Sequence, residues 1–357
     1  MSKAFQIYAW SVVGVAVLLV WWGAAVTTEK AGMAVATWPL MYGQFNPEGW
    51  YKVWPYLLEH GHRLIASLVG VLTLVMFAVR FVRSLPAAAE LLGLVAVLAV
   101  STWAVHQKWY FSALLGALAC CVWLGMSWKN RDWPLLTKLA GLALILVSLQ
   151  AALGGIRVLE VSDVLATIHG CLAQIFFCLL VLIGLASSKS WDQRSKASEP
   201  LVRRLRWLAG SLLLVIFIQL VLGAAMRHHH RFGLADEGIL TTGGSWFPQN
   251  VTFDLVILFL HKWWAVVVFV LAISCAIWTW TRLRDLRGVR RLAAVIGWLV
   301  VFQLLLGVSV IVAGKTFWIT NFHVINGLTI LTLSFCLTVK AIRTIPLAKE
   351  SGTANVG

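Results

Sequence analysis

Ten long apolar segments constrain the fold of this chain more than any other feature of its sequence. They lie at about 7–26, 57–79, 90–106, 110–127, 137–156, 164–186, 207–226, 254–280, 292–313 and 321–341. An α-helix needs roughly 20 predominantly apolar residues to cross a bilayer. The chain is also 60% hydrophobic and only 12% charged, which is too apolar for a soluble domain. We therefore predict an all-α polytopic membrane protein with about ten transmembrane helices.

Two of the segments allow a second interpretation. The segment at 7–26 follows Lys3 as the core of a signal peptide would, but it is long enough to span a bilayer, and we interpret it as a retained helix. Only Gln107, Lys108 and Trp109 separate 90–106 from 110–127. Because one helix over both segments would overrun the membrane, we predict a helical hairpin there.

The basic residues indicate the orientation in the membrane. If both termini are cytoplasmic, most of the 29 Lys and Arg residues fall on cytoplasmic segments, as the positive-inside rule expects. The formal net charge of +15 then reflects membrane anchoring, and no nucleic-acid partner is needed to explain it. All nine histidines fall on the outer side in this topology.

An internal repeat divides the chain into two similar halves. Gly23 precedes His62 by nearly the same interval as Gly223 precedes His261, and a glutamine–glycine pair precedes both His169 and His323. Each half is therefore predicted to be a four-helix unit, with the hairpin inserted into the first. The predicted divisions are an N-terminal bundle at 1–190 with its hairpin at about 90–127, a cytoplasmic linker at 191–206, a C-terminal bundle at 207–345 and a flexible tail at 346–357.

A cluster of ionisable residues opens the apolar segment at 57–79. Glu59, His60, His62 and Arg63 lie together there, and ionisable side chains at membrane depth indicate a functional site. Glu59 and His62 share one helix face because they are three residues apart. A zinc site formed by Glu59, His60 and His62 is the local alternative, although neighbours at this spacing converge poorly on a tetrahedral ion.

In each half, two helices carry one histidine each near the outer end. Such a pair is suited to be the axial ligands of a haem iron: His62 with His169, and His261 with His323. Arg63 and Lys262 directly follow two of these histidines, and either propionate contact or interfacial snorkelling explains them.

The two halves differ at the position three residues before the first of these histidines. Glu59 stands there in the first half and Leu258 in the second. This difference predicts that chemistry takes place in the first site, whereas the second holds a permanent haem.

The sequence resembles the haem A synthase family in several motifs. They are Glu59-x-x-His62-Arg63, the loop at 31–39, His169-Gly170 with Gln174, the segment 227–235, His261-Lys262 and His323. The resemblance implies an integral membrane oxidoreductase that converts the C8 methyl group of haem O into the formyl group of haem A and carries a haem b cofactor. It also implies that Glu59 is the catalytic acid, that His62 and His169 bind the substrate haem, and that His261 and His323 bind haem b.

The resemblance further implies a place in the bacterial inner membrane, haem sites toward the outer face, and a role in terminal oxidase assembly. The expected partners are the lipid bilayer, a haem O synthase that supplies the substrate, an electron acceptor that the sequence does not identify, and a second copy of the chain. Three features depart from the family: 29–56 lacks a cysteine pair, the hairpin exceeds the usual eight helices, and His228, His229 and His230 have no assigned role. Nor does the sequence assign a role to His60 or His106.

Two functions of other classes remain open at this stage. A di-haem b cytochrome would relay electrons, for example with a quinone, without modifying haem; the one-sided Glu59 argues against it. A transporter built from repeats would use the histidines as a proton or metal path. However, repeats separated by an even number of helices run parallel, and broken midplane helices are not evident.

Overall fold

The computed structural model describes residues 2–228, 238–249 and 251–347. Ten α-helices in this part of the chain are long and apolar enough to cross a membrane, which confirms the predicted fold class. They are α1 (Lys3–Thr28), α2 (Trp54–Phe81), α3 (Leu85–His106), α4 (Tyr110–Asn130), α5 (Leu135–Leu159), α6 (Asp163–Ala186), α7 (Glu199–His228), α8 (Phe253–Arg282), α9 (Arg287–Val312) and α10 (Phe317–Arg343). Short 3₁₀ helices (Ala31–Met33, Trp50–Lys52 and Lys189–Asp192) and two strands, β1 (Lys196–Ala197) and β2 (Ile345–Pro346), complete it.

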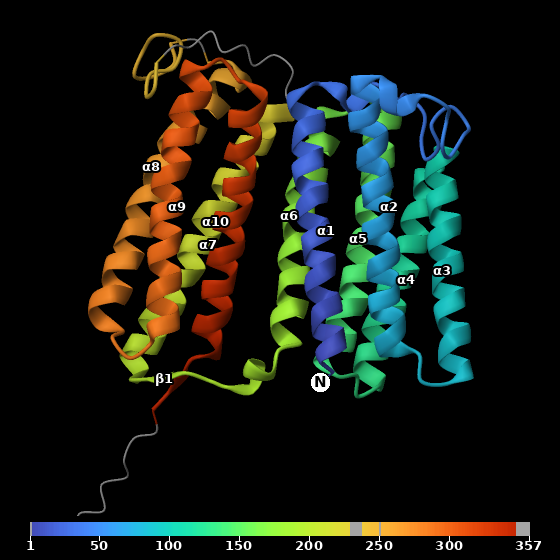
Figure 1. The fold of residues 1–357 in the computed structure, drawn as a ribbon, viewed down its shortest axis with the longest axis horizontal. Helices are drawn as coiled ribbons and strands as arrows, with labels where there is room; N and C mark the ends of the chain where they lie inside the picture. Colours follow the sequence, from blue (N-terminus) through green and yellow to red (C-terminus); the bar gives the residue numbers. More distant parts are fainter. Residues whose placement is uncertain (1, 229–237, 250, 348–357) are drawn as a thin grey trace, which may run out of the picture.

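The helices form two bundles that stand side by side (Figure 1). In the N-terminal bundle α1, α2, α5 and α6 pack around a core that includes Phe77, Met76 and Leu180. In the C-terminal bundle α7 to α10 enclose Leu205, Leu212 and Ile296. The bundles meet where α1 and α6 contact α7 and α10.

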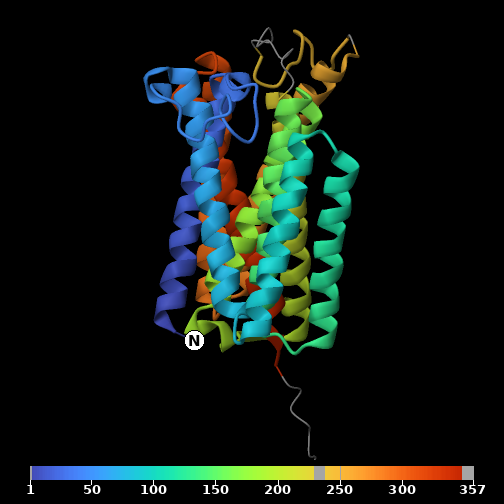
Figure 2. The same ribbon diagram turned by 90° about the vertical axis from the view of Figure 1, so that its right-hand side faces the viewer.

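The predicted hairpin is present as α3 and α4, which lie outside the N-terminal bundle (Figure 2). Both helices pack on α5. Their other faces carry exposed apolar side chains such as Leu92, Phe111 and Val122, as expected for a surface in contact with lipid. The hairpin is therefore an addition to the four-helix frame and not one of its members.

Several helices extend beyond the apolar segments that predicted them. The clearest case is α7, which begins at Glu199 inside the expected linker at 191–206. Its first turns are amphipathic: Val202 and Leu205 are buried, whereas Arg203 and Arg204 are exposed. Hydropathy alone does not detect these first turns, because the basic residues on the exposed face lower the mean hydropathy of the segment.

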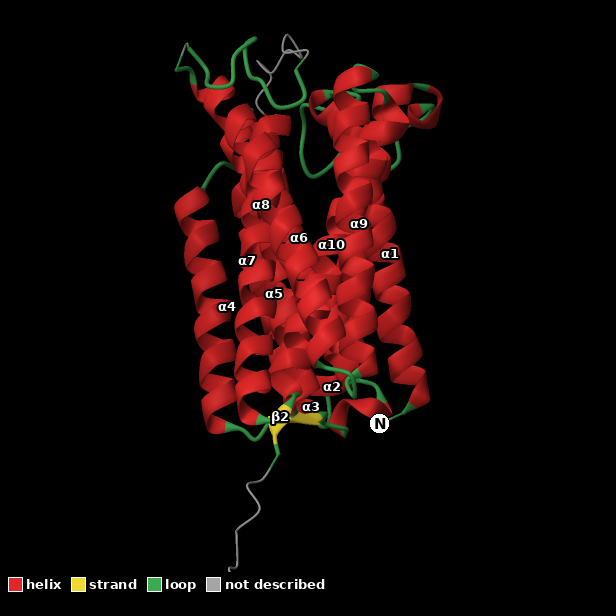
Figure 3. Cartoon of the chain, turned by 90° about the vertical axis from the view of Figure 1, so that its left-hand side faces the viewer, coloured by secondary structure: helices red, strands yellow, loops and turns green. Residues whose placement is uncertain are grey.

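The loops at one end of the molecule contain a second trace of the repeat. We call this end, which carries the loops at 29–53 and 239–252, the histidine end; the opposite end is the basic end (Figure 3). Each of the two loops contains a tight turn, closed by Met41 with Gln44 and by Thr242 with Ser245. Gly43, Gly243 and Gly244 adopt positive φ in these turns, where glycine is favoured.

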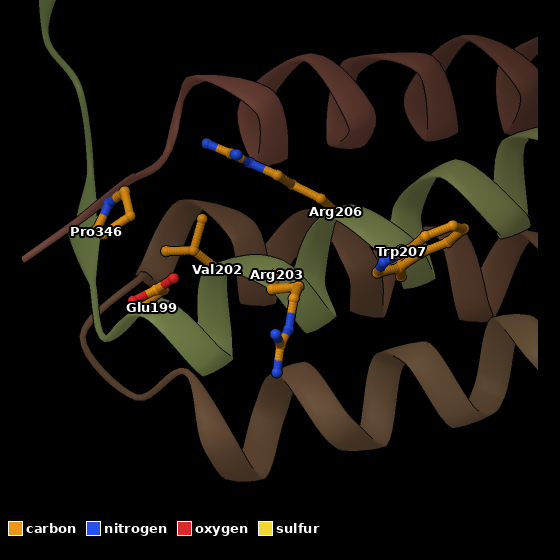
Figure 4. A pocket seen from close by; sticks show the side chains of 6 residues that line it. All are labelled: Glu199, Val202, Arg203, Arg206, Trp207 and Pro346. Atoms are coloured by element: carbon orange, nitrogen blue, oxygen red, sulfur yellow. The ribbon is translucent and has the colours of Figure 1, made fainter.

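At the basic end, β1 and β2 pair in parallel and tie the segment before α7 to the end of α10. The guanidinium of Arg206 donates to the carbonyl oxygens of Ala341, Ile342 and Thr344 at 2.8–3.3 Å. A shallow cavity of about 340 Å³ lies beside it (Figure 4). Its lining comprises Glu199, Val202, Arg203, Arg206, Trp207 and Pro346. Because Arg206 braces the chain here, we interpret the cavity as part of this junction. Most of the predicted tail, from residue 348 onward, lies outside the described residues.

Candidate functional site

The four candidate ligand histidines lie at one depth near the histidine end. His62 is on α2, His169 on α6, His261 on α8 and His323 on α10. A rise of 1.5 Å per residue places each roughly 9–12 Å along the axis from the first residue of its helix. The structure thus brings the residues of the repeat to equivalent positions in the two bundles.

Each of these histidine rings packs against a glycine of the preceding bundle helix. A Cβ atom built at Gly23 or Gly223 would lie 3.0 Å from Cε1 of His62 or His261. The corresponding distances from Gly154 to His169 and from Gly307 to His323 are 3.3 and 3.4 Å. Glycine is favoured at these positions because a methyl group would displace the imidazole by a few tenths of an ångström.

The imidazoles form two pairs, one in each bundle. His169 lies within electrostatic range of His62, and His323 lies within electrostatic range of His261. Nδ1 of His62, His169 and His323 is buried and has no hydrogen-bond partner within the described part of the chain. Such an orphaned nitrogen costs free energy unless a ligand engages the ring. The paired, half-buried imidazoles are of the kind that would bind the iron of a haem.

Glu59 is almost fully buried and both of its carboxylate oxygens are engaged. Oε1 pairs with Nη2 of Arg63 at 2.7 Å, and Oε2 accepts the backbone N–H of Val35 at 2.7 Å. Arg63 in turn donates to the carbonyl oxygens of Val35 and Thr37. The Glu59–Arg63 pair therefore anchors the first loop over the end of α2.

Lys262 plays the corresponding part in the second bundle. Its Nζ donates to the carbonyl oxygens of Gly238 and Thr241 at 2.8 and 2.7 Å. Arg63 and Lys262 were considered for contacts with propionates or for snorkelling to the interface. Both donate to loop carbonyl oxygens, so in each bundle the cation after the histidine holds the loop that follows the preceding helix.

The structure also locates histidines to which the sequence assigned no role. His60 is buried and packs edge-on against Trp50, with ring centroids 4.8 Å apart. His106, at the end of α3, contacts the carbonyl oxygen of Trp38 through Nδ1 at 2.5 Å. His228 ends α7 and its Nε2 lies 3.6 Å from a Cβ built at Gly170, beside His169. His229 and His230 lie outside the described residues.

Two half-buried arginines lie near the site. Arg157, at the end of α5, donates to the carbonyl oxygen of Gly32 and lies within electrostatic range of Glu59 and His169. It stands at a helix end, where a basic residue is ordinary, so the sequence carried no signal for it. Arg227, at the end of α7, donates to the carbonyl oxygen of Ala24 at 2.9 Å and so joins the bundles. It opens the segment 227–235 that contributes to the family resemblance, but the sequence assigned it no role.

The alternative zinc site finds no support in the geometry. Within the described residues, no group of three or more His, Cys, Asp or Glu side chains is arranged to hold a metal ion. Glu59 faces Arg63 and the first loop, whereas His60 faces Trp50. His62 packs on Gly23, so the three side chains of the alternative zinc site contact different parts of the structure.

Comparison with known proteins identifies the family. A model of the COX15-CtaA family, described as cytochrome oxidase assembly protein, matches residues 99–335, which is more than half of the chain. The chain belongs to this family.

A heme A synthase from Shouchella clausii is 25% identical over 309 residues, covering 84% of this chain and 85% of the relative. A heme A synthase from Beijerinckia indica is 25% identical over 366 residues, covering 90% and 88%. One from Sphingopyxis alaskensis is 29% identical over 205 residues, covering 51% and 54%.

Membership of the haem A synthase family confirms the resemblance seen in the motifs. The family match extends from the end of α3 to α10, and it therefore includes His169, His261 and His323. The matches to the first two relatives cover most of both chains. The family implies a haem-related substrate or product, and the ten apolar helices indicate a membrane protein.

Proposed function

We propose that the protein is a haem A synthase that oxidises the C8 methyl group of haem O to a formyl group in its N-terminal bundle. The observation that carries the proposal is Glu59, a buried carboxylate one helical turn from His62 with no counterpart in the second bundle. Relatives named heme A synthase that align over most of the chain support the same activity.

In this proposal His62 and His169 bind the substrate haem from opposite sides. His261 and His323 would hold a haem b, which when bound would supply one-electron redox chemistry. Arg157, with its charge close to Glu59 and His169, is suited to interact with a propionate or to hold the first loop over the substrate.

The role proposed for Glu59 is to receive protons from attacking water. Each hydroxylation adds the oxygen of one water to the methyl carbon and removes an electron pair and two protons. After the second hydroxylation, loss of water leaves the formyl group. The electrons pass to an acceptor of unassigned identity. Each oxygen of Glu59 keeps a lone pair beyond its bond to Arg63 or Val35, so it remains able to accept a proton. A positioned general base contributes roughly 10²–10⁴-fold in rate.

The proposal extends to location and partners. The basic end would face the cytoplasm with both termini, and the haem sites would lie toward the outer face of the bacterial inner membrane, because the Lys and Arg residues gather at the basic end. The protein would receive haem O from a haem O synthase, deliver haem A for terminal oxidase assembly, and associate with a second copy. An electron relay without haem modification is not favoured, since the relatives are named as synthases.

The test is to supply haem O to purified Glu59→Gln protein and to analyse the extracted haems. We expect haem A formation to fall by roughly 10²–10⁴-fold while haem O binding and the C-terminal haem spectrum persist. Glu160→Gln is the matched control, because it neutralises an exposed carboxylate at the same end of the molecule.

The anchoring role of Glu59 has to be separated from a chemical one. Arg63→Met breaks the same ion pair but leaves the carboxylate, and we expect a smaller loss of haem A formation from it. An equal loss in Arg63→Met and Glu59→Gln would show that the ion pair serves only to hold the loop. Haem A formation at the parent rate in Glu59→Gln would reject Glu59 as the base.

A further inference from the structure

Three of the four candidate ligand histidines are held by a glutamine from the preceding bundle helix. Nε2 of Gln150 donates to the backbone carbonyl oxygen of His169 at 3.2 Å. Nε2 of Gln219 and of Gln303 makes the same bond to His261 and His323, at 3.0 Å in each case. Each glutamine stands four residues before the glycine that packs on the imidazole, at Gly154, Gly223 and Gly307.

Two of these glutamines also lie against the imidazole rings. Nε2 of Gln219 is 3.2 Å from Nδ1 of His261, and Nε2 of Gln303 is 3.2 Å from Nε2 of His323. Oε1 of Gln303 accepts from Asn326 at 2.7 Å, which braces that side chain. The amides of Gln219 and Gln303 therefore contact both the backbone and the ring of their histidines, whereas the amide of Gln150 contacts the backbone of His169.

His62 is the exception. Four residues before Gly23 the chain has Leu19, whose side chain cannot donate a hydrogen bond. α1 and α2 are joined instead by Trp22, whose Nε1 donates to the carbonyl oxygen of Leu58 at 2.8 Å. That bond lies one turn from His62. The ring of His62 contacts the backbone of Leu19, but within the described residues it has no side-chain amide from α1 beside it. The exception falls in the bundle proposed to bind the substrate.

We propose that Gln150, Gln219 and Gln303 are positioning residues for the histidines that they contact, and that Leu19, which lacks the amide, makes His62 the ligand that releases the substrate haem. The inference rests on the proposed function, because a substrate haem has to enter and leave the bundle whereas haem b stays. Partners of a ligating histidine orient its ring, and their loss lowers metal affinity 10–100-fold. One ligand with a glutamine partner, His169, and one without, His62, would keep the substrate oriented and still allow exchange.

The experiment introduces a glutamine where the chain has Leu19 and removes the glutamine at Gln219. Leu19→Gln adds the amide at the releasing ligand, with Leu19→Met as a control of similar size. Both are made in a His323→Ala background, so that the N-terminal bundle is the site observed. The measurement is the rate at which bound haem passes to excess apomyoglobin in detergent, followed by visible spectroscopy. We expect Leu19→Gln to slow this transfer 10–100-fold relative to Leu19→Met.

The reciprocal variant is Gln219→Met, which removes the amide from the C-terminal bundle at nearly constant size. We expect the low-spin haem of that bundle to be lost 10–100-fold faster, and its absorption bands to shift, with helix content unchanged by circular dichroism. Transfer rates that are equal in Leu19→Gln and Leu19→Met, or a parent rate in Gln219→Met, would overturn the inference. A parent protein that binds no haem would instead refute the proposed function.

Discussion

The two bundles share a frame and differ around a single histidine. In both, a glycine packs on the first histidine so closely that a Cβ built on it would lie 3.0 Å from the ring. In both, a cation after that histidine holds loop carbonyl oxygens, and the loop contains a tight turn. They differ at Glu59 against Leu258 and at Leu19 against Gln219. Both differences lie within about one helical turn of His62 or on the helix face that packs against it.

This comparison separates features that both bundles share from features that only the N-terminal bundle has. The features common to both bundles are sufficient to place two imidazoles at one depth, and in the proposed function they serve haem binding. The features confined to the N-terminal bundle add a buried carboxylate and remove a side-chain amide, and in the proposed function they serve the reaction and the exchange of its substrate.

The largest expected effect comes from removing a ligand in either bundle. His261→Ala or His323→Ala should abolish the low-spin b-type spectrum, because the iron loses an axial ligand. His62→Ala or His169→Ala should leave that spectrum in place and stop haem A formation. Visible spectra of the purified variants, together with analysis of extracted haems, check both outcomes.

The assignment of one haem to each bundle depends on this contrast. If His62→Ala removed the b-type spectrum as completely as His261→Ala, the two sites would not be independent. A spectrum that survives in both C-terminal variants would exclude His261 and His323 as the ligand pair.

A smaller effect is expected at the glycines that pack on the rings. Gly23→Ala and Gly223→Ala place a methyl group 3.0 Å from an imidazole, which has to move by a few tenths of an ångström. Overpacking of this kind costs about 1–3 kcal/mol. Gly154→Ala and Gly307→Ala, at 3.3 and 3.4 Å, should cost less. Thermal unfolding followed by the haem spectrum measures the difference, and equal midpoints in all four variants would contradict it.

Much of this arrangement was predictable from the sequence because it follows from periodicity. The apolar segments predicted all ten helices, and the spacing of glycine and histidine predicted the repeat. The contacts of Arg63 and Lys262 were not predictable, since a loop of irregular backbone gives no pattern that indicates which carbonyl oxygens approach a side chain. Arg157 was missed for a related reason: its bond to Gly32 joins segments that are distant in the sequence.

A further prediction compares the two loop anchors. Arg63→Met removes a guanidinium that bonds two carbonyl oxygens and Glu59, whereas Lys262→Met removes an ammonium that bonds Gly238 and Thr241. Hydrogen bonds to charged groups contribute about 1.5–3 kcal/mol each. Amide hydrogen exchange of each loop should therefore rise by roughly tenfold or more in its own variant. A change in the opposite loop, with none in its own, would contradict the anchoring role.

The smallest expected effect concerns the hairpin, which the C-terminal bundle lacks. Glu160, just beyond α5, accepts a hydrogen bond from the hydroxyl of Tyr110 and pairs with Lys108 at 3.3 Å. The hydrogen bond from Tyr110, and then the bond and charge of Lys108, lower the pKa of Glu160 below its ordinary value. A group with a lowered folded-state pKa stabilises the contact at pH values above its unfolded pKa and loses this contribution as the pH falls through the folded pKa.

The turn between α3 and α4 should therefore be protected down to the ordinary range of glutamate, about pH 4.3, and lose protection only below it. Amide exchange at 106–110, measured in detergent between neutral and acid pH, tests this step. Glu160→Gln should remove the step, because a neutral amide has no proton to gain there. Lys108→Met should keep it, since the bond from Tyr110 remains. The same acid response in Glu160→Gln and the parent would show that Glu160 does not hold the hairpin, and that its apolar contacts with α5 do.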